Sequence, residues 1–470
     1  MVWMPTIEGR RGPAYQRIVD ALADDIAAGR VHQGQRLPTH RALAAALDLD
    51  VTTVTRAYAE ARRMLLVDAR TGRGTFVAAN ASAMWRGSSA PAIDLSMILP
   101  PQPDGADLDA RLAATLAEIR RQAGFGPYLT YQQAGGSASE RAVAAHWLGG
   151  RISSLTRDRV LLAPGTQSAL MALLLELAAP GDIVLTEALT YPGLKAAAAA
   201  ARLTLVGMEM DGDGVKPDAL EAACQRHKAK LVVLTPTMQN PTTATMSQSR
   251  RARIAGIIAK RQLMLIEDDP YFPLDPAVQP LAALIPERTY LAASLSKCIA
   301  PGLRTSLLVL PSVEAAQRVA ASLRAVAQMP TPLLTAIAIR WLQNGSADAI
   351  IASARNETAA RQTICRDVLG QGRFATQAHS PHIWIAAPGA WSSERFSALL
   401  RSRGLGVVAS DAFAVSPGAP SGIRAALGAA RNRAELKAAL EILRDAVGVG
   451  AADARAVDLA RSVEARPKTG

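Results

Sequence analysis

One lysine in this chain stands where covalent chemistry would be favoured. Lys297 is one of only eight lysines, and it follows closely after the apolar residues 290–293, which predict a buried strand. Burial lowers the pKa of an amine, and a neutral amine is the nucleophile that Schiff-base formation requires. Ser294 and Arg304 lie on either side and could hold a phosphate, Arg304 through its planar donor fork. A lone lysine after a strand is usually an ordinary surface residue, so this interpretation needs further support.

A turn from a strand into a helix provides part of that support. Residues 161–163 predict a strand, and the chain then passes through Gly165 into a helix that begins near Thr166 and Gln167. The first turn of a helix has free backbone N–H groups and the positive end of the helix dipole, both of which favour a phosphate.

Two more predicted strands end in groups that suit the ring of a pyridine cofactor. Residues 265–266 lead into acids that include Asp268, with Tyr271 close behind, and a carboxylate there can pair with a protonated pyridine nitrogen. Residues 231–234 are followed by Asn240, whose amide can bond to a ring oxygen. Such residues are individually common in loops, but their shared position at the carboxyl ends of successive strands predicts a single site.

Together these motifs resemble the fold-type I pyridoxal-phosphate (PLP) enzymes of the class I aminotransferase family. The resemblance implies that Lys297 binds the cofactor covalently and transfers protons, that Asp268 pairs with the pyridine nitrogen, and that Tyr271 contacts the ring oxygen; these three are the expected catalytic residues. It assigns Arg424 to the α-carboxylate of an amino-acid substrate, the alternative being a surface arginine after a loop. The expected cofactor contacts are Gly165, Thr166, Gln167, Tyr191, Asn240, Asp268, Tyr271, Ser294, Ser296, Lys297, Arg304 and Tyr131.

Two of these contacts and two departures from the family pattern concern the edge of the site. Tyr191 matches the aromatic residue that stacks on the ring, and Tyr131 matches a tyrosine that reaches the phosphate of the neighbouring subunit. Thr243 replaces the glycine of the usual Asn-Pro-Thr-Gly turn, and residues 132–134 replace a tyrosine-led Gly-Asp-Pro turn. These departures affect the edge of the cofactor site and the subunit contact.

The first eighty residues predict a separate, mainly helical winged helix-turn-helix domain. Ile18, Leu22 and Ile26 form one apolar helical face in residues 15–30, and further helices are expected after the capping residue Thr39 and from residue 51. Short strands at residues 65–67 and 75–77, joined by a glycine-rich turn, complete the pattern. In such domains the third helix enters the major groove and the wing contacts the backbone or the minor groove. The candidate DNA contacts are Thr39, Arg41, Thr52, Thr53, Thr55, Arg56 and Arg73; a small helical domain with ordinary surface arginines is the alternative.

This stretch resembles the GntR-type winged helix. The matching segments are Gly34-x-Arg36-Leu37-Pro38-Thr39-x-Arg41-x-Leu43-Ala44, Thr53-Val54-x-Arg56-Ala57-Tyr58 and Gly72-x-Gly74-Thr75-Phe76-Val77. Val51 stands where the family usually has a basic residue, and Met64 replaces a common glycine. Loss of the basic contact would weaken phosphate binding or change the DNA site that is read.

Charge and composition restrict the function classes. The net charge of +12 is spread along the chain, so it supports DNA binding only weakly. The longest apolar stretch, residues 169–179, contains Glu176 and is too short for a membrane span, and no secretion signal is visible. Cys224, Cys298 and Cys365 are too scattered for a disulfide framework or a zinc cluster. His379 and His382 lack further metal ligands nearby, so no metal is expected, and we predict a cytoplasmic, multidomain protein.

The expected organisation has four parts. The winged helix covers residues 1–80, a proline-rich linker residues 81–105, and an α/β domain residues 106–447, with a large subdomain at about 130–310 and a small one at about 311–447. Apolar runs at residues 183–185, 231–234, 263–266, 290–293 and 307–310 predict a largely parallel sheet. Residues 448–470 are expected to form a frayed helix or a disordered tail.

A GntR-type winged helix joined to an aminotransferase-like domain is the arrangement of the MocR family of transcriptional regulators. That resemblance implies a homodimeric, PLP-dependent regulator that binds operator DNA and senses the cofactor or an amino compound. The first alternative is a working aminotransferase with a fused DNA-binding domain, and the second is a DNA-binding module on an inactive enzyme scaffold. The sequence does not identify the effector, the operator or the sign of regulation.

Overall fold

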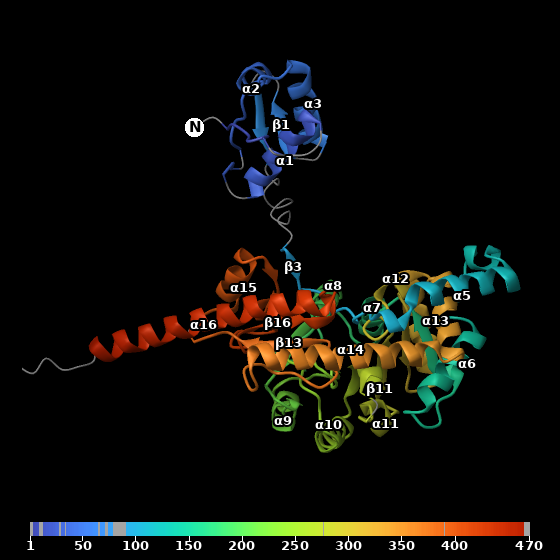
Figure 1. Cartoon of the computed structure of the whole chain (residues 1–470). Helices are drawn as coiled ribbons and strands as arrows, with labels where there is room; N and C mark the ends of the chain where they lie inside the picture. Colours follow the sequence, from blue (N-terminus) through green and yellow to red (C-terminus); the bar gives the residue numbers. More distant parts are fainter. Residues whose placement is uncertain are drawn as a thin grey trace, which may run out of the picture. The chain divides into compact units, whose positions relative to one another are not determined.

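The computed structural model of this chain contains two compact units, Met1–Pro91 and Ala92–Gly470 (Figure 1). The structure describes residues 3–8, 13–27, 30–32, 34–63, 66–70, 74–78, 91–275, 277–389 and 391–464. No helix among these residues is both long enough and apolar enough to cross a membrane.

The first unit contains three helices and a two-stranded hairpin around one small core. The elements are α1 (Ala14–Ala27), α2 (His40–Leu47), α3 (Val51–Arg63), β1 (Val67–Arg70) and β2 (Gly74–Val77). The predicted face of α1 is confirmed, since Ile18, Leu22 and Ile26 are at most 2% exposed. Thr39 caps α2 as predicted, because its side chain accepts a hydrogen bond from the Ala42 N–H. These elements confirm the predicted winged helix-turn-helix.

The hairpin begins later than the sequence predicts. A strand was expected at residues 65–67, whereas β1 covers Val67–Arg70 and pairs antiparallel with β2 from Val67 opposite Val77 to Arg70 opposite Gly74. Leu66 instead fills the core at 0% exposure, and the apolar character of this residue reflects that burial rather than strand pairing. The predicted wing residue Arg73 lies outside the described residues.

A seven-stranded sheet forms the centre of the second unit. In spatial order its strands are β4 (Val160–Ala163), β12 (Ser306–Val309), β11 (Thr289–Ser294), β10 (Met264–Asp268), β9 (Leu231–Leu234), β5 (Ile183–Glu187) and β6 (Thr204–Met208). Only β12 runs antiparallel to its neighbours, which confirms the predicted, largely parallel sheet. The strands are continuously apolar because both faces of the sheet are covered.

Helices cover the two faces of this sheet. The helices of the unit are α5 (Leu108–Ala123), α6 (Ala138–Gly149), α7 (Thr166–Leu177), α8 (Pro192–Ala200), α9 (Pro217–Arg226), α10 (Gln248–Arg261), α11 (Leu281–Leu284), α12 (Val313–Ala327), α13 (Pro332–Gln343), α14 (Ser346–Leu369), α15 (Ser393–Ser402) and α16 (Arg433–Glu464). Helices α7, α8 and α12 share one core with alternate strand residues such as Leu161 and Val233. The next residue along each strand faces the opposite side of the sheet. Leu162 packs there with α6 and α13, and Leu234 packs with α9, α10 and α11.

A smaller part of the second unit contains an antiparallel sheet of β13 (His382–Ala386), β16 (Gly422–Ala426) and β15 (Val408–Ala409). Helices α14, α15 and α16 pack on it, and α14 and α16 run beside one another (Figure 1). Helix α14 connects the two parts, since Ile350 belongs to the core of the large sheet and Cys365 to the small core. The short pair β7 (Met210–Asp211) and β8 (Gly214–Val215) forms a hairpin.

Three expected boundaries differ from the structure. Helices α12 and α13 pack on the large sheet, so the change to the small part occurs along α14 rather than at residue 311. Helix α16 continues to Glu464, beyond the expected domain end at residue 447. The second unit begins at Ala92, and β3 (Ile93–Asp94) pairs with β14 (Leu405–Gly406), so residues 92–105 of the expected linker belong to the folded unit.

Candidate functional site

The residues predicted to do chemistry follow neighbouring strands of the large sheet. Asp268 ends β10, and Lys297 lies three residues beyond the end of β11. The two strands are parallel and paired, with Asp268 opposite Ala292. Asn240 follows β9, the neighbour of β10 on the other side. The parallel order therefore places the carboxyl ends of these strands together, as the sequence predicts.

Asp268 is a buried carboxylate whose hydrogen-bonding capacity is not used within the described chain. Its side chain is 6% exposed, and Oδ1 has no hydrogen-bond partner among the described residues. Burial, together with the charges of Asp269 and Glu187, raises the pKa of Asp268 to about 7, and the opposing effect comes from Lys297. An unpaired acceptor in such a place suits a cationic donor, which is the property of a protonated pyridine nitrogen.

The acids on either side of Asp268 are held by a separate buried network. Glu267 accepts hydrogen bonds from the Leu281 and Ala282 N–H groups, both at 2.8 Å, and lies 3.5 Å from the Arg251 guanidinium. Both side chains of this ion pair are 0% exposed. Asp269 accepts a hydrogen bond from the Thr237 hydroxyl. The three consecutive acids therefore differ: Glu267 accepts two backbone hydrogen bonds, Asp269 is bonded through Oδ2 and has an unpaired Oδ1, and Asp268 has an unpaired Oδ1 without a side-chain partner among the described residues.

Lys297 has the lowered pKa expected of a buried amine. Burial and the positive charge of Arg424 lower the pKa of Lys297 to about 8, against the raising effect of Asp268. Its Nζ donates a hydrogen bond to the Ile98 carbonyl oxygen at 2.8 Å. Lys297 therefore lies within electrostatic range of both Asp268 and Arg424, as a single site requires.

The predicted phosphate contacts gather at the start of α7. Gly165 has a φ of +91°, and a Cβ at this position would collide with the guanidinium of Arg304, so only glycine permits the approach. Arg304 Nη2 donates to the Pro164 carbonyl at 3.2 Å, and the Thr166 hydroxyl lies 3.3 Å from that of Ser306. The free N–H groups at the start of the twelve-residue helix α7 therefore lie close to the guanidinium of Arg304, and both kinds of group suit a phosphate.

Neighbouring groups complete this end of the site. Gln167 Nε2 donates to the Gly193 carbonyl at 2.9 Å, and its buried Oε1 has no partner among the described residues. The Ser294 hydroxyl accepts a hydrogen bond from the Ser296 N–H at 3.1 Å, and both serines are buried. The half-buried Tyr191 has its pKa raised by burial and by Asp268, while Arg304 and Arg424 lower it, which places its hydroxyl among the charged groups of the site.

Arg424 is buried, so the alternative of a surface arginine is wrong. It is 6% exposed on β16, and its Nη1 donates to Asn240 Oδ1 at 2.9 Å. Nη2 donates to the Ser96 carbonyl, and the buried Nε has no partner among the described residues. Its guanidinium carbon lies 5.1 Å from the centre of the Phe413 ring. Burial lowers the pKa of Arg424 to about 10, so it remains a cation at neutral pH.

Tyr271 and the turn that carries Asn240 are also buried. Tyr271 is 1% exposed, and burial raises the pKa of its hydroxyl while the Arg424 charge opposes the shift. Thr243, which replaces the usual glycine, has a φ of +66° and is 1% exposed. The turn therefore retains the left-handed conformation that explains the glycine preference, at some strain for a β-branched residue.

Two of the predicted cofactor contacts are exposed in the described chain, Tyr131 and Arg304. Tyr131 is 83% exposed, as is Leu129, and Arg304 is exposed beside the start of α7.

Two groups of residues escaped the sequence reasoning. The first is the backbone of residues 96–98, which accepts hydrogen bonds from both Arg424 and Lys297. The second is His382, which the sequence identified only as an unsupported metal ligand: its Nε2 lies 3.1 Å from the carbonyl of Gln239, the residue directly before Asn240. Burial and Arg424 lower the pKa of His382 to about 3, so the ring is neutral and its N–H donates to that carbonyl. The partner residues are distant in sequence, so no local pattern could have identified either contact.

The first unit presents a second set of candidate residues. Arg41 and Arg56 are exposed, and the Arg56 guanidinium lies 4.0 Å from the centre of the Tyr15 ring. Thr52 and Thr55 are exposed but bond locally, Thr52 to the Asp50 carboxylate and Thr55 to the Val51 carbonyl at 2.8 Å. Thr53 is partly buried. The two arginines, one on α2 and one on α3, are thus exposed cations available to an anionic partner.

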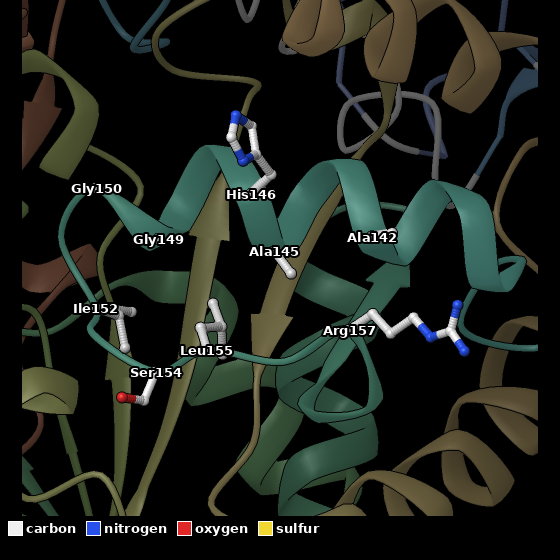
Figure 2. Close-up of a pocket in the computed structure, with 9 residues that line it drawn as sticks. All are labelled: Ala142, Ala145, His146, Gly149, Gly150, Ile152, Ser154, Leu155 and Arg157. Carbon is white, nitrogen blue, oxygen red and sulfur yellow. The ribbon is translucent and has the colours of Figure 1, made fainter.

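A hollow elsewhere on the second unit lacks the features of a site. Figure 2 shows it on α6 and the following loop, where it is lined by residues that include His146, Ser154 and Arg157. The polar side chains point in different directions, and none of the residues predicted to do chemistry contributes to it (Figure 2).

Comparison with known families gives two matches. Residues 101–443 match the family described as aminotransferase class I and II, and residues 14–77 match the bacterial regulatory proteins of the gntR family. The chain is 31% identical over 453 residues to YdeF, an uncharacterised HTH-type transcriptional regulator of Bacillus subtilis, with 94% of this chain and 96% of the relative covered. It is 26% identical over 442 residues to the HTH-type transcriptional regulator TauR of Rhodobacter capsulatus, with 84% and 89% covered.

Solved structures show the same fold for the second unit. The α-aminoadipate aminotransferase LysN of Thermus thermophilus, complexed with N-(5'-phosphopyridoxyl)-L-leucine, has a TM-score of 0.70 at 23% identity, covering 77% of this chain and 93% of that chain. The kynurenine aminotransferase of Pyrococcus horikoshii, in complex with PMP, has a TM-score of 0.71 at 22% identity, covering 79% and 94%. At these identities the likeness establishes the fold alone.

Proposed function

Because this chain belongs to the class I and II aminotransferase family and carries a GntR-family DNA-binding domain, we propose that it is a transcriptional regulator that senses an amino acid at a PLP site on Lys297. The aminotransferase family is PLP-dependent, and the match to the regulator YdeF covers 96% of that relative, through both family-matched parts of this chain. The residue roles, the operator and the dimer described below are part of the proposal.

The residues of the site fit the cofactor. Twelve buried side-chain polar atoms lack hydrogen-bond partners among the described residues, and three of them, Asp268 Oδ1, Arg424 Nε and Gln167 Oε1, belong to the predicted site. Unpaired buried polar atoms are rare because each is destabilising, so a cluster of them supports a polar ligand. When bound, PLP supplies an aldehyde for the lysine and a ring that draws electrons from the amino-acid α-carbon.

Each residue has a task that follows from its contacts. Asp268 holds a proton at the pyridine nitrogen, because a buried carboxylate stabilises a neighbouring cation. Lys297, with a pKa of about 8, accepts or donates a proton near neutral pH. The start of α7 and Arg304 would bind the phosphate, and Asn240 and Tyr271 would hold the ring oxygen. By the family resemblance, Tyr191 would contact the ring.

The ligand class follows from Arg424. A buried guanidinium with an unused Nε–H suits the α-carboxylate of an amino acid. An amine without a carboxylate would leave this charge without its anionic partner. We therefore propose an amino acid rather than a simple amine as the effector.

The first unit would bind operator DNA through α3 in the major groove, with Arg41 and Arg56 contacting phosphates or base edges. Neutralisation of phosphates would supply much of the affinity, so binding should weaken with salt. Contact with DNA requires the cytoplasm of a bacterial cell, which is the location that we propose.

We further propose a homodimer. Phe125, Leu129 and Tyr131 form an exposed apolar loop, which a second copy of the chain would cover. By its resemblance to the family, Tyr131 would then contact the phosphate in the partner. Light scattering of the wild type and of Tyr131→Asp tests this, with a monomeric or weakened variant expected.

The observation that carries the functional proposal is the unpaired Asp268 carboxylate beside Lys297. Titration of the purified full chain with PLP should produce visible absorbance that Lys297→Ala abolishes. The same protein, with and without PLP and amino acids, should then be tested on a library of random double-stranded DNA, since its operator is unknown. A ligand-dependent change in DNA affinity is expected, and absence of both signals would contradict the proposal.

A second candidate is a working aminotransferase. It is favoured by one observation: Lys297, Asp268, Tyr271 and Arg424 are all present and gathered, so the geometry gives no reason why amino transfer should fail. Multiple turnovers between an amino acid and a 2-oxo acid would support this alternative. Stable binding without turnover would support the regulator.

A further inference from the structure

Both cations of the ligand site are hydrogen-bonded to one short stretch of backbone. Arg424 donates to the carbonyl of Ser96, and Lys297 donates to the carbonyl of Ile98 at 2.8 Å. The two carbonyl oxygens accept hydrogen bonds from N–H groups that an amino-acid carboxylate, at Arg424, and the cofactor, at Lys297, would also use. We call residues 93–98 the latch segment.

The latch segment is held on both sides by the second unit. The Ile93 and Leu95 N–H groups donate to Gly404 and Gly406, and the Leu95 carbonyl accepts from the Ala426 N–H at 2.8 Å. Ala426 lies two residues from Arg424 on β16. Leu95 is 0% exposed and Ile98 is 3% exposed, so these two side chains of the segment are packed in the interior of the unit.

The position of this segment in the chain gives it a second property. It follows directly after Pro91, the last residue of the DNA-binding unit, so any displacement of residues 93–98 acts on the chain that leads to that unit. The expected linker thus ends in residues that contact the ligand site.

We propose that the latch segment couples the ligand site to the DNA-binding unit, because the Ser96 carbonyl competes with the carboxylate of an amino acid for Arg424. A carboxylate is the better acceptor for a buried guanidinium, since it carries charge and can accept two parallel hydrogen bonds. Its binding removes the Ser96 contact, loosens the latch segment and changes the constraint on the chain before it. The inference rests on the proposed function, since it assumes an amino acid at Arg424.

Competition also sets the affinity for the ligand. A site whose competent state is only partly populated binds more weakly by that fraction. Any change that weakens the latch without touching the site should therefore strengthen amino-acid binding.

Asp94 offers such a change. Its Oδ1 accepts a hydrogen bond from the Ser96 N–H at 2.9 Å and thereby helps to fix Ser96, whose carbonyl in the following peptide accepts from Arg424. Its side chain is exposed, and we assign it no part in ligand binding. Asp109, an exposed acid in the first turn of α5, provides a matched control.

The first test is amide hydrogen exchange of the PLP-loaded full chain with L-alanine or ethylamine. The two share an amine, but only alanine has a carboxylate, and the visible spectrum reports binding of each. Saturating alanine should raise the exchange rates of the Ile93, Leu95 and Ala426 amides severalfold, while ethylamine should leave these rates unchanged. The amides of the β7–β8 hairpin serve as the control, and neither ligand should change their exchange rates. In Arg424→Ala the difference between alanine and ethylamine should disappear.

The outcomes separate the latch from the proposed function. If alanine changes the visible spectrum but not exchange of residues 93–98, the latch is overturned and the proposed function stands. If neither PLP nor alanine changes the spectrum, the proposed function fails and the latch fails with it. Equal loosening by ethylamine would also overturn the proposal, because it excludes the carboxylate as the cause.

The second test is affinity. Asp94→Ala should lower the apparent Kd of alanine about three- to tenfold, the effect expected from one weakened hydrogen bond, while Asp109→Ala should leave it unchanged. An unchanged or higher Kd in Asp94→Ala, with normal PLP absorbance showing a folded site, would overturn the proposal.

Discussion

Arg424 and Asn240 are joined by a buried hydrogen bond, Nη1 to Oδ1 at 2.9 Å, between a strand of the small sheet and the turn after β9 of the large one. The bond orients two groups to which the proposed function gives separate tasks. It would leave the Asn240 amide nitrogen for the cofactor ring, and it fixes the plane of the guanidinium proposed to receive the ligand carboxylate. The two parts of the second unit therefore meet at the proposed site.

The first prediction concerns Arg424. Arg424→Lys should keep the charge but lose the planar fork and the bond to Asn240, so the affinity for L-alanine should fall about ten- to a hundredfold. Affinity for ethylamine should change much less. Spectrophotometric titration of the PLP-loaded protein measures both, and an equal loss for both ligands would contradict the assigned role.

The second prediction concerns Asp268. Asp268→Asn should weaken PLP retention about tenfold or more, because a neutral amide cannot replace a charged partner for the pyridine nitrogen. Dialysis followed by measurement of visible absorbance tests this. Asp218→Asn, which changes an exposed acid on α9, is the control and should retain PLP as the wild type does.

The third prediction is a pH dependence. Lys297 has its pKa lowered from 10.5 to about 8, so its neutral, reactive fraction should rise with pH through a midpoint near 8 and level off about one pH unit above that midpoint. The rate of PLP attachment, followed by stopped-flow absorbance, should show the same curve.

Two variants should move that midpoint in opposite directions. Arg424→Met removes a positive charge that lowers the pKa of Lys297, so the midpoint should rise. Asp268→Asn removes a negative charge that raises this pKa, so the midpoint should fall. A shift of both variants in the same direction would contradict the electrostatic account.

Much of the site could be predicted because its side chains follow apolar strands. In a parallel sheet covered on both faces, strands are readable as apolar runs, and the residues after them meet at one edge. Asp268, Asn240 and Lys297 all follow this rule. The same reasoning identified the helices of the first unit from their apolar faces.

The remaining contacts could not be predicted because they depend on the backbone or on distant partners. Ser96 and Ile98 act through carbonyl oxygens, which every residue has, and the prolines around them indicated a linker. His382 bonds to Gln239, far away in sequence, so its buried neutral state had no local signal. Arg424 could not be distinguished from a surface arginine until its burial was known.

The fourth prediction concerns the network beneath Asp268. Arg251→Met leaves Glu267 buried without its ion-pair partner, which should lower the free energy of unfolding by about 3–5 kcal/mol. Arg253→Met on the same helix removes an exposed partner of Asp218 and should change it by less than about 1 kcal/mol. Urea denaturation of the full chain measures both, and similar values for the two variants would contradict the importance of the buried pair.

The fifth prediction separates a DNA contact from a structural contact. Arg56 is exposed on α3, but its guanidinium also lies over the Tyr15 ring, so loss of DNA binding in Arg56→Ala would be ambiguous alone. Tyr15→Leu removes the stacking and keeps the charge, whereas Arg56→Gln removes the charge. If Arg56 contacts a phosphate, Arg56→Gln should weaken binding to selected DNA and reduce the slope of log K against log salt by about one, while Tyr15→Leu should keep that slope. Arg41→Gln, on a residue without the ring contact, should also reduce the slope. An unchanged slope in both arginine variants would exclude these residues as phosphate contacts and move the DNA-binding face away from α2 and α3.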